Sequence, residues 1–192
     1  MRISFLVAQL FNFFSFVPAQ VNSDLLLPTN QKGITIKHTY YTLSYSEADK
    51  QAEWVAYYLT PASINGLQKR SSKFLADPLL SNPVRPDSYT KSGYDRGHLC
   101  PAGDRKSSKE LYDETFFTSN IAPQIPSFNN GVWNRLEQKT RYWTTKYNGL
   151  YVITGGVLKG EMKTIGKEKV AVPNYFYKIL MTKDHTKMIG FL

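Results

Sequence analysis

Cysteine is almost absent from this sequence of 192 residues, in which Cys100 is the only one. A single thiol excludes a disulfide within the chain, and it cannot build a structural zinc site, which needs several thiolate or imidazole ligands. As a nucleophile, Cys100 would need a histidine and a positively charged environment. His98 is two residues away, but Pro101 follows at once and interrupts the strand. We therefore interpret Cys100 mainly as a small packing residue.

Acidic residues are also scarce, because 15 Asp and Glu stand against 24 Lys and Arg, which gives a net charge of +9. A basic protein attracts polyanions such as nucleic acid, anionic lipid or acidic glycan, although many small basic proteins bind none of these. Hydrophobic residues make up 42% of the chain and charged residues 20%, which is typical of a globular protein and not of a disordered one. The length suits one domain with one core.

Long apolar segments are missing except at the N-terminus. Residues 3–17 are mostly apolar and follow Arg2, and Val17-Pro18-Ala19 resembles a cleavage site with small residues. We predict that residues 1–19 are a signal peptide, so that the mature protein is secreted or periplasmic and has no membrane segment. An uncleaved amphipathic anchor is the alternative. Residues 20–49 are then an N-terminal arm with a first strand.

Alternating apolar and polar residues predict strands over 34–45 and 53–60, paired as an antiparallel hairpin. The stretch 61–92, rich in proline, serine and cations, predicts a functional surface loop. Further patterns predict helices over 109–114 and 129–147, and strands over 115–119, 150–154, 175–182 and 187–192. The expected class is α+β around an antiparallel sheet. Because Leu192 ends the sequence inside an apparent strand, we expect a C-terminal part to be missing.

The segment Asp95-Arg96-Gly97-His98 places a carboxylate, a guanidinium and an imidazole within four positions. Glycine allows a tight approach of the backbone, and an imidazole can act as a general base near neutral pH. Taken alone, so short a motif more often marks an ordinary turn. It therefore needs support from other segments.

The predicted helix 129–147 carries Asn129, Trp133, Glu137 and Arg141 at intervals of four. Side chains at this spacing form one slowly turning stripe along a helix. The stripe can be a solvated face with a Glu137–Arg141 ion pair worth a few tenths of a kcal/mol. However, Trp133 and Leu136 indicate that part of this face is buried, and buried polar groups need partners.

Three separated segments, 92–99, 119–124 and 129–141, closely resemble the DNA/RNA non-specific endonucleases, which are the ββα-metal or His-Me finger nucleases. Arg70-x-x-x-Phe74-x-x-Asp77 is similar to the entry of that family's active-site loop. The resemblance runs from about residue 50 to the end, so 50–192 is the predicted endonuclease domain. It implies hydrolysis of phosphodiester bonds in single- and double-stranded DNA and RNA without sequence specificity, with Mg²⁺ as cofactor and Mn²⁺ as a substitute.

The resemblance also implies residue roles. His98 is the general base, Asn129 is the direct metal ligand, and Glu137 holds water of the ion's hydration shell. Arg141 and Arg70 bind phosphate oxygens.

The remaining motif residues are assigned with their alternatives. Arg96 and Asn120 are counted among the candidate catalytic residues. Arg96 can instead pair with a carboxylate, and Asn120 can either orient His98 or a neighbouring backbone group or be a turn amide. Asp95 is counted as substrate-binding, although it can instead order the turn or the outer shell of the metal. His38 and His185 lack a catalytic setting.

Other cations near the loop could follow a phosphate backbone. These are Lys69, Lys73, Arg85, Lys91, Arg105, Lys106 and Lys109. A homodimer and an inhibitor protein are further candidate partners. Two alternatives to the enzyme remain open: an inactive nucleic-acid-binding domain, and a secreted phosphodiesterase for small substrates.

Overall fold

The computed structural model describes residues 27–29, 32–68 and 73–192. The predicted signal peptide, most of the N-terminal arm, and the candidates Lys69 and Arg70 lie outside these residues.

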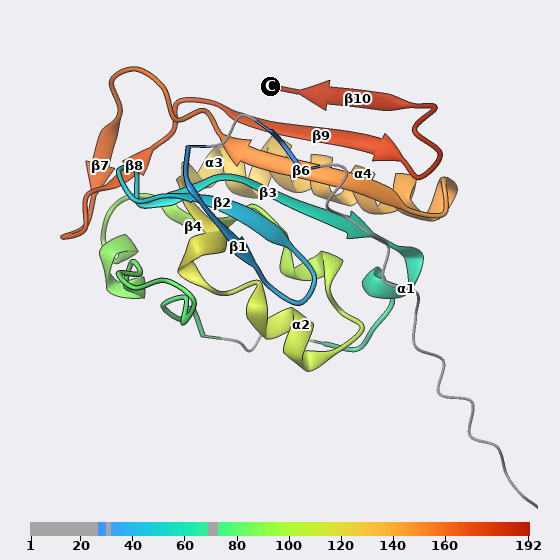
Figure 1. Ribbon diagram of the computed structural model, residues 1–192, viewed down its shortest axis with the longest axis horizontal. Coiled ribbons are helices and arrows are strands. Elements are labelled where there is room, and N and C mark those ends of the chain that lie inside the picture. The colour runs from blue at the N-terminus through green and yellow to red at the C-terminus, as the bar shows by residue number, and fades with distance from the viewer. Residues whose placement is uncertain (1–26, 30–31, 69–72) are drawn as a thin grey trace, which may run out of the picture.

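A six-stranded antiparallel sheet forms the centre of the fold, in the order β1-β2-β3-β6-β9-β10 (Figure 1). This confirms the predicted α+β class with an antiparallel sheet. The strands are β1 Ile34–Lys37, β2 Thr42–Ser46, β3 Gln51–Leu59, β6 Leu150–Gly156, β9 Phe176–Thr182 and β10 Met188–Phe191.

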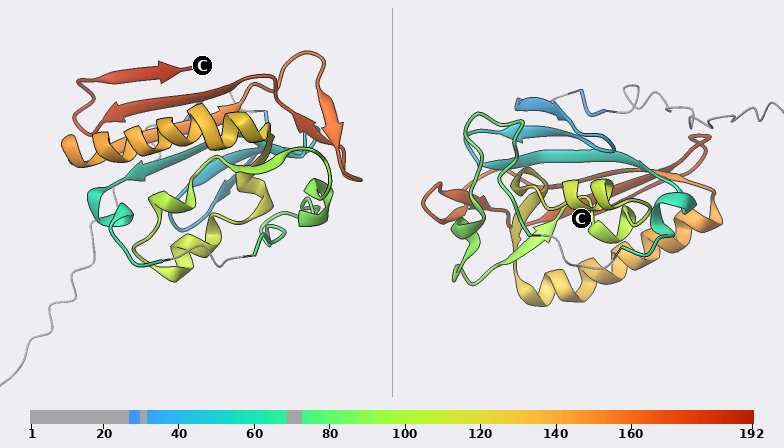
Figure 2. Two further views of the ribbon diagram at one scale, coloured as in Figure 1. Left: turned by 180° about the vertical axis from the view of Figure 1, so that it is seen from behind. Right: turned by 90° about the horizontal axis from the view of Figure 1, so that it is seen from below.

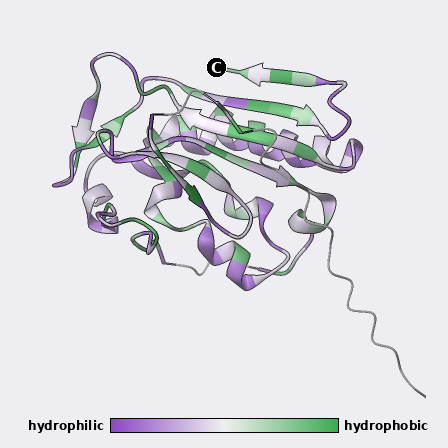
Figure 3. Ribbon diagram, in the orientation of Figure 1, coloured by the Kyte–Doolittle hydropathy of each residue, from purple (hydrophilic) through white to green (hydrophobic). Residues whose placement is uncertain are grey.

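The main core lies between this sheet and the long helix α4, Asn134–Lys146, which runs across one face of the sheet (Figures 1 and 2). Leu43, Val55 and Val152 are completely buried in this core, and Leu136 and Trp143 of α4 pack against it. Burial of one such aliphatic side chain contributes about 1.5–3 kcal/mol, so the strands with most apolar positions define the centre of the sheet. Figure 3 shows hydrophobic residues recurring along the strands and hydrophilic ones concentrated in loops and on α2, Lys109–Glu114.

A separate two-stranded hairpin joins β4, Asp95–His98, to β5, Ile121–Gln124, with His98 opposite Ile121. A smaller apolar cluster supports it, built from residues of the 84–89 loop, of β5 and of the ribbon β7–β8. The ribbon strands are Lys163–Ile165 and Val170–Val172, which the sequence patterns did not predict. The hairpin therefore packs against this small cluster on one side, while Ala122 of β5 belongs to the main core.

Two strand predictions are wrong. Residues 34–45 form two strands, because the chain turns at 38–41, where the His38 amide donates to the Tyr41 carbonyl over 2.9 Å. No glycine or proline marks this turn, so the alternation conceals it. Residues 115–119 do not form a strand either: a 3₁₀ turn, Thr118–Asn120, leads into β5. By contrast, the predicted helix over 109–114, the strand near 150–154 and the hairpin of 175–182 with 187–192 are confirmed.

The predicted helix over 129–147 is confirmed from residue 134 onward but begins irregularly. A short turn, α3 Pro126–Phe128, precedes a wide π-type turn, Asn129–Trp133, and α4 follows. Gly131 interrupts the turn with φ −97° and ψ −110°. Within the part of the chain that the structure describes, none of the helices has the length and apolarity needed to span a membrane.

Candidate active site

The hairpin strand β4 presents different side chains on its two faces. Strand alternation places Arg96 and His98 on one face and Asp95 and Gly97 on the other. A Cβ at Gly97 would lie 2.2 Å from the side chain of Gln124 on β5. Any residue other than glycine would therefore displace the buried Gln124 side chain.

Aromatic rings fix the position of His98. Its imidazole centroid lies 5.5 Å from that of Phe74 and 4.9 Å from that of Phe116, which it meets edge to face. The Arg96 guanidinium carbon lies 5.2 Å from the centre of the same Phe74 ring. Phe74, from the predicted entry motif, thus contacts both residues, whereas the sequence gave no indication of Phe116. Rings on two sides limit the orientations open to the imidazole.

Arg96 is tied to the loop that precedes the hairpin. Its Nη2 atom donates to the carbonyl of Pro86 over 2.9 Å and to Oγ1 of Thr90 over 3.2 Å. Both partners are neutral oxygens, so these contacts do not support the alternative in which Arg96 pairs with a carboxylate. Arg96 holds the 86–90 loop against the hairpin while its guanidinium stays partly exposed.

Asp95 connects β4 to the start of the helix. Its Oδ2 atom accepts hydrogen bonds from Nδ2 of Asn129 over 3.0 Å and from Nδ2 of Asn130 over 2.9 Å. An ionised carboxylate can only accept, so the amide nitrogen of Asn129 must face Asp95 and its Oδ1 atom points elsewhere. The structure thus brings Asp95 and Asn129 together and gives Asn129 the orientation that a metal ligand needs.

Asn120 lies behind the hairpin and is completely buried. Its Oδ1 accepts from the Cys100 amide over 2.8 Å, and its Nδ2 donates to the carbonyls of Cys100 and Thr115 over 2.9 and 2.8 Å. These bonds use the whole side-chain amide within the protein. Asn120 thus braces the chain just after His98 and does not reach solvent, which fits the role of orienting a neighbouring backbone group.

Further along the helix, Arg141 forms an ion pair with Asp104, with 2.9 Å between Nη1 and Oδ1. The other oxygen of Asp104 accepts from the Tyr57 hydroxyl over 2.9 Å. The sequence suggested Glu137 as the partner of Arg141, but Arg141 turns to the buried carboxylate of Asp104 instead. The Nη1 atom of the Arg141 guanidinium is therefore already bound within the protein.

Glu137 is partly buried on the same stripe. Burial raises the pKa of the Glu137 carboxyl to about 7. The positive charges of Lys178 and Arg141 partly oppose this rise, whereas the negative charge of Asp104 adds to it. A carboxyl with this pKa changes its charge near neutral pH, which is typical of functional sites.

Lys178, on β9, was not predicted as part of the site. It is 1% exposed, its ammonium donates to Oγ1 of Thr154 over 2.6 Å, and it lies 4.8 Å from the centre of the Trp133 ring. Burial lowers the pKa of Lys178, while Glu137 and Asp104 raise it. The sequence did hold a signal, because Lys178 shares its strand face with Phe176 and Leu180. A lysine between two core positions is unusual.

Three further residues considered in the sequence lie in different environments in the structure. Arg105 is completely buried, with its guanidinium 4.8 Å from the centre of the Tyr57 ring, so it cannot follow a nucleic-acid backbone. Lys109 is exposed and pairs with Asp113 on α2. His38, expected to be unremarkable, is buried against Asp77, with 2.9 Å between Nε2 and Oδ2.

The comparisons with known proteins now decide the family. The family model described as DNA/RNA non-specific endonuclease matches residues 22–192. The chain belongs to this family.

Among curated relatives of this nuclease-family chain, the mitochondrial nuclease EXOG of Danio rerio is 36% identical over 159 residues, covering 76% of the chain and 46% of the relative. Mitochondrial endonuclease G of Bos taurus is 37% identical over 154 residues, covering 73% and 52%. Nuclease C1 of Cunninghamella echinulata is 33% identical over 178 residues, covering 83% and 71%. The chain thus spans about half the length of the mitochondrial relatives.

A solved structure agrees. The chain is similar to one in the crystal structure of the EndoG/EndoGI complex, with a TM-score of 0.77 and 31% identity, covering 83% of this chain and 73% of that one. The predicted recognition and fold class are therefore confirmed.

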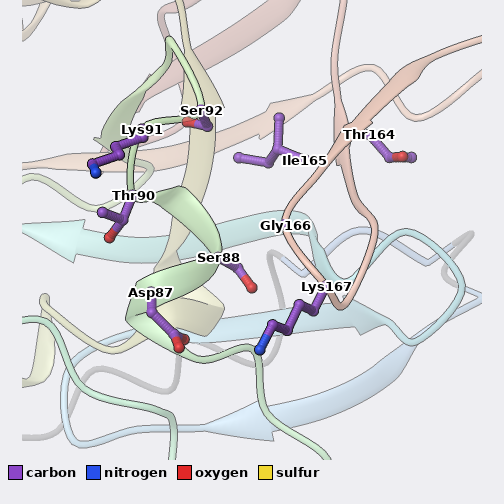
Figure 4. A pocket seen from close by; sticks show the side chains of 9 residues that line it. All are labelled: Asp87, Ser88, Thr90, Lys91, Ser92, Thr164, Ile165, Gly166 and Lys167. Carbon is purple, nitrogen blue, oxygen red and sulfur yellow. The ribbon is translucent and has the colours of Figure 1, made fainter.

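Two cavities flank the hairpin of this family member. One of about 370 Å³ lies between residues 87–92 and the β7–β8 turn (Figure 4), and Thr90, the partner of Arg96, lines it. In Figure 4, Lys167 points toward Asp87 and Ser88, whereas Lys91 points away from the turn, so the two cations do not converge on one ligand. The other cavity, of about 770 Å³, is lined by Tyr94 and Phe128, which adjoin Asp95 and Asn129 in the chain.

The residues present suit a hydrated ion more than a fully protein-ligated one. Among the described residues, no group of three or more His, Cys, Asp or Glu side chains is placed to hold a metal. An amide oxygen and a nearby carboxylate are hard donors, which Mg²⁺ accepts while keeping most of its water. The oriented amide of Asn129 beside Asp95 fits such an ion.

Proposed function

We propose that this protein is a metal-dependent endonuclease that hydrolyses phosphodiester bonds of DNA and RNA, single- or double-stranded, without reading the sequence. Mg²⁺ is the working ion and Mn²⁺ its substitute. The observation that carries the proposal is the Asp95–Asn129 hydrogen bond, because it ties the strand that ends in His98 to the helix start that offers a metal ligand. Membership of the endonuclease family supports the same activity.

Asn129 would hold the ion through Oδ1, since Asp95 occupies its amide nitrogen. When bound, the ion supplies positive charge that offsets the charge developing on the phosphate and the leaving oxygen. Glu137, on the same stripe of the helix, would accept hydrogen bonds from the ion's hydration shell.

His98 would take the proton from the attacking water. Phe74 and Phe116 hold the imidazole in place, and an imidazole is the side chain most often used for proton transfer near neutral pH. Arg96 keeps the adjoining loop in place and retains a partly exposed guanidinium for a phosphate oxygen. Arg141 would contribute charge to the site while bound to Asp104.

The absence of sequence specificity follows from the kind of contact. A net charge of +9 attracts the phosphate backbone, which is the same for every sequence. The aromatic cavity at Tyr94 and Phe128 offers surfaces on which any base can stack. Binding should therefore weaken steeply as salt is added.

Plasmid nicking tests the proposal directly. Purified full-length protein should nick supercoiled DNA and degrade RNA with Mg²⁺ or Mn²⁺ and do neither with EDTA. Asn129→Ala should raise the Mg²⁺ concentration for half-maximal rate at least about tenfold, because one ligand is lost. Asn130→Ala is the matched control, since it removes the second donor to Asp95 and a bond to the Pro126 carbonyl but keeps Asn129, and its Mg²⁺ titration should stay close to wild type.

The alternatives give different results in the same assays. DNA binding without metal-dependent cleavage would replace the enzyme by a nucleic-acid-binding domain. Cleavage of a small phosphodiester that DNA does not inhibit would favour the small-substrate enzyme.

Export is part of the proposal and rests on the charged and apolar pattern of residues 1–19. Expression of the full sequence with N-terminal sequencing of the mature protein should find it outside the cytoplasm, beginning near Gln20. Because the relatives above include mitochondrial proteins, recovery from mitochondria would overturn export. A homodimer and an inhibitor protein are proposed partners, and light scattering of the purified protein tests the first.

A further inference from the structure

Asp104 is a buried carboxylate that connects three elements of the fold. It ends the 3₁₀ turn Ala102–Asp104. Its Oδ1 atom accepts from Nη1 of Arg141 on α4 over 2.9 Å, and its Oδ2 atom accepts from the hydroxyl of Tyr57 on β3 over 2.9 Å. With both oxygens bound, the carboxylate cannot rotate without breaking a contact inside the protein. Asp104 is therefore able to hold Arg141 in one position.

The Arg141 guanidinium is bound at one of its nitrogen atoms. Within the described residues, Nη1 is the atom of this group that donates to a protein acceptor, and 23% of the side chain stays exposed. The turn also packs against the group, because a Cβ at Gly103 would lie 3.1 Å from Nη1 and 3.4 Å from the guanidinium carbon. A guanidinium carries N–H donors on all three nitrogens, so those on Nε and Nη2 stay available to an anion.

Stability gives little reason for this arrangement. A buried carboxylate loses its hydration, and an ion pair with a partly exposed arginine often does no more than offset that loss. An unrestrained arginine, by contrast, has many rotamers and loses this freedom when it binds a phosphate. A guanidinium that Asp104 has already fixed loses much less at that step. The contact therefore favours a reaction in which Arg141 must be placed accurately.

We propose that Asp104 is a positioning residue for the nuclease reaction: with the Tyr57 hydroxyl, it fixes the Arg141 guanidinium so that the free N–H groups bind an oxygen of the scissile phosphate. This inference rests on the proposed function, in which Arg141 contributes positive charge to the site. Asp104 acts only through Arg141. Its removal should therefore have no further effect on the rate once Arg141 is absent.

A double-mutant cycle in the full-length protein tests this dependence. Asp104→Asn keeps the volume but offers one oxygen to two donors, so it should lower kcat per folded molecule about tenfold. KM for DNA should stay within about twofold, because many backbone contacts share the binding. Arg141→Ala should lower kcat about a hundredfold, as loss of a donor to the transition state does. The double variant should be no slower than Arg141→Ala alone.

The Tyr57 hydroxyl offers a milder change with a matched control. Tyr57→Phe removes the donor to Oδ2 of Asp104 and should lower kcat about threefold, because the carboxylate is then held at one oxygen only. Tyr45→Phe is the control, since Tyr45 is also a buried tyrosine of the sheet but its hydroxyl has no hydrogen-bond partner within the described residues. Its kcat should match that of wild type.

Free guanidinium provides a readout that lost packing cannot imitate. Arg141→Ala leaves space beside the Asp104 carboxylate, where a guanidinium ion can bind by the same charge-assisted contact. Millimolar guanidinium chloride should therefore raise the kcat of Arg141→Ala about tenfold above the value in KCl of equal ionic strength. The double variant with Asp104→Asn should show no such gain.

The outcomes are distinct. If wild type cleaves DNA and Asp104→Asn has wild-type kcat per folded molecule, the role of Asp104 is refuted while the nuclease stands. Additive losses in the double variant, or equal rescue with and without Asp104, refute it as well. Should Asp104→Asn fail to fold, a wild-type kcat of Tyr57→Phe together with no rescue of Arg141→Ala refutes it. If wild type shows no metal-dependent cleavage, the proposed function itself fails, and this result comes from the reference protein.

Discussion

The six-stranded sheet and the β4–β5 hairpin differ in how their positions are fixed. In the sheet, strand pairing runs over six strands, and completely buried side chains such as Leu43, Val55 and Val152 interact by non-directional contact. The hairpin has only two strands, and beside buried apolar residues such as Ile121 it depends on the buried amide of Asn120, which is hydrogen-bonded to the backbone of Cys100. Apolar contacts tolerate small shifts, whereas each buried polar group needs its partner in a definite place. The sheet thus provides stability, and the hairpin provides fixed positions for reactive groups.

The largest expected effect comes from the hairpin. His98→Ala should lower kcat by about a thousandfold, the contribution of a general base, while DNA binding and the melting temperature stay close to wild type. Single-turnover cleavage and fluorescence anisotropy with labelled DNA measure the two properties. Wild-type-like cleavage would show that His98 is not the base and that the hairpin is not the reactive region.

A substitution in the sheet should show the reverse pattern. Leu43→Ala removes a completely buried side chain and should lower the free energy of unfolding by about 2–5 kcal/mol. Because Leu43 lies on β2, which carries none of the candidate site residues, kcat per folded molecule should remain within about twofold of wild type. Urea unfolding and active-site titration check this, with the exposed Ile34→Ala as control. A large loss of kcat in the folded variant would show that the core of the sheet also affects the reactive groups of the hairpin.

The link between the two regions should have an intermediate, pH-dependent effect. His38, in the β1–β2 turn, contacts Asp77, which follows the Phe74 segment. Burial acts to raise the pKa of Asp77, but hydrogen bonds from His38 and Ser119 outweigh it, so the pKa is lowered. A lowered carboxyl pKa contributes stability above the unfolded value of about 3.9, and this is lost as the pH falls through the folded value.

His38→Phe should therefore cost about 1–3 kcal/mol at neutral pH, because it leaves a buried carboxylate short of a partner. The difference from wild type should shrink only as the pH falls below about 3.9 and through the lowered pKa of Asp77, where this carboxyl becomes protonated in wild type as well. Urea unfolding at neutral and acidic pH measures it. His185→Asn, at an exposed turn residue with φ 59°, is the control and should show no such pH dependence. A constant difference at all pH values would mean that lost packing, and not the carboxylate, explains the effect.

The smallest effect is expected on α2, outside both regions. Lys109→Ala breaks an exposed i,i+4 pair with Asp113 and should change stability by less than about 0.5 kcal/mol. Differential scanning calorimetry is sensitive enough to detect a larger change. A loss above about 1 kcal/mol would show that surface pairs contribute to the fold more than such pairs usually do.

The sequence predicted the sheet better than the turns. Strands such as 150–156 and 176–182 are short runs of mostly apolar, aromatic and β-branched residues, and this signal of a buried strand is local. The turn at 38–41 and the 3₁₀ turn at 118–120 lack glycine and proline, and tertiary hydrogen bonds fix them. Local patterns cannot show such bonds, so these turns were read as strands.

For the site, the motifs indicated the residues but not their partners. Asp95 and Asn129 were named from the sequence, whereas their contact depends on how β4 lies against the helix start. The polarity of Asn120 suggested chemistry, but its burial makes it a support for the Cys100 backbone. Arg141 was expected beside Glu137 and instead reaches Asp104, 37 positions earlier in the chain. Lys178 was not named from the sequence, although it lies on the strand face of Phe176 and Leu180.

The burial of Cys100 has a practical consequence for labelling experiments. Its side chain is completely buried, and burial raises the pKa of the thiol to about 12, so almost no thiolate forms under physiological conditions. Maleimide and iodoacetamide dyes react with thiolates and need access to them. A cysteine introduced on the surface would therefore take up a fluorophore selectively in the native protein, without prior removal of the natural thiol.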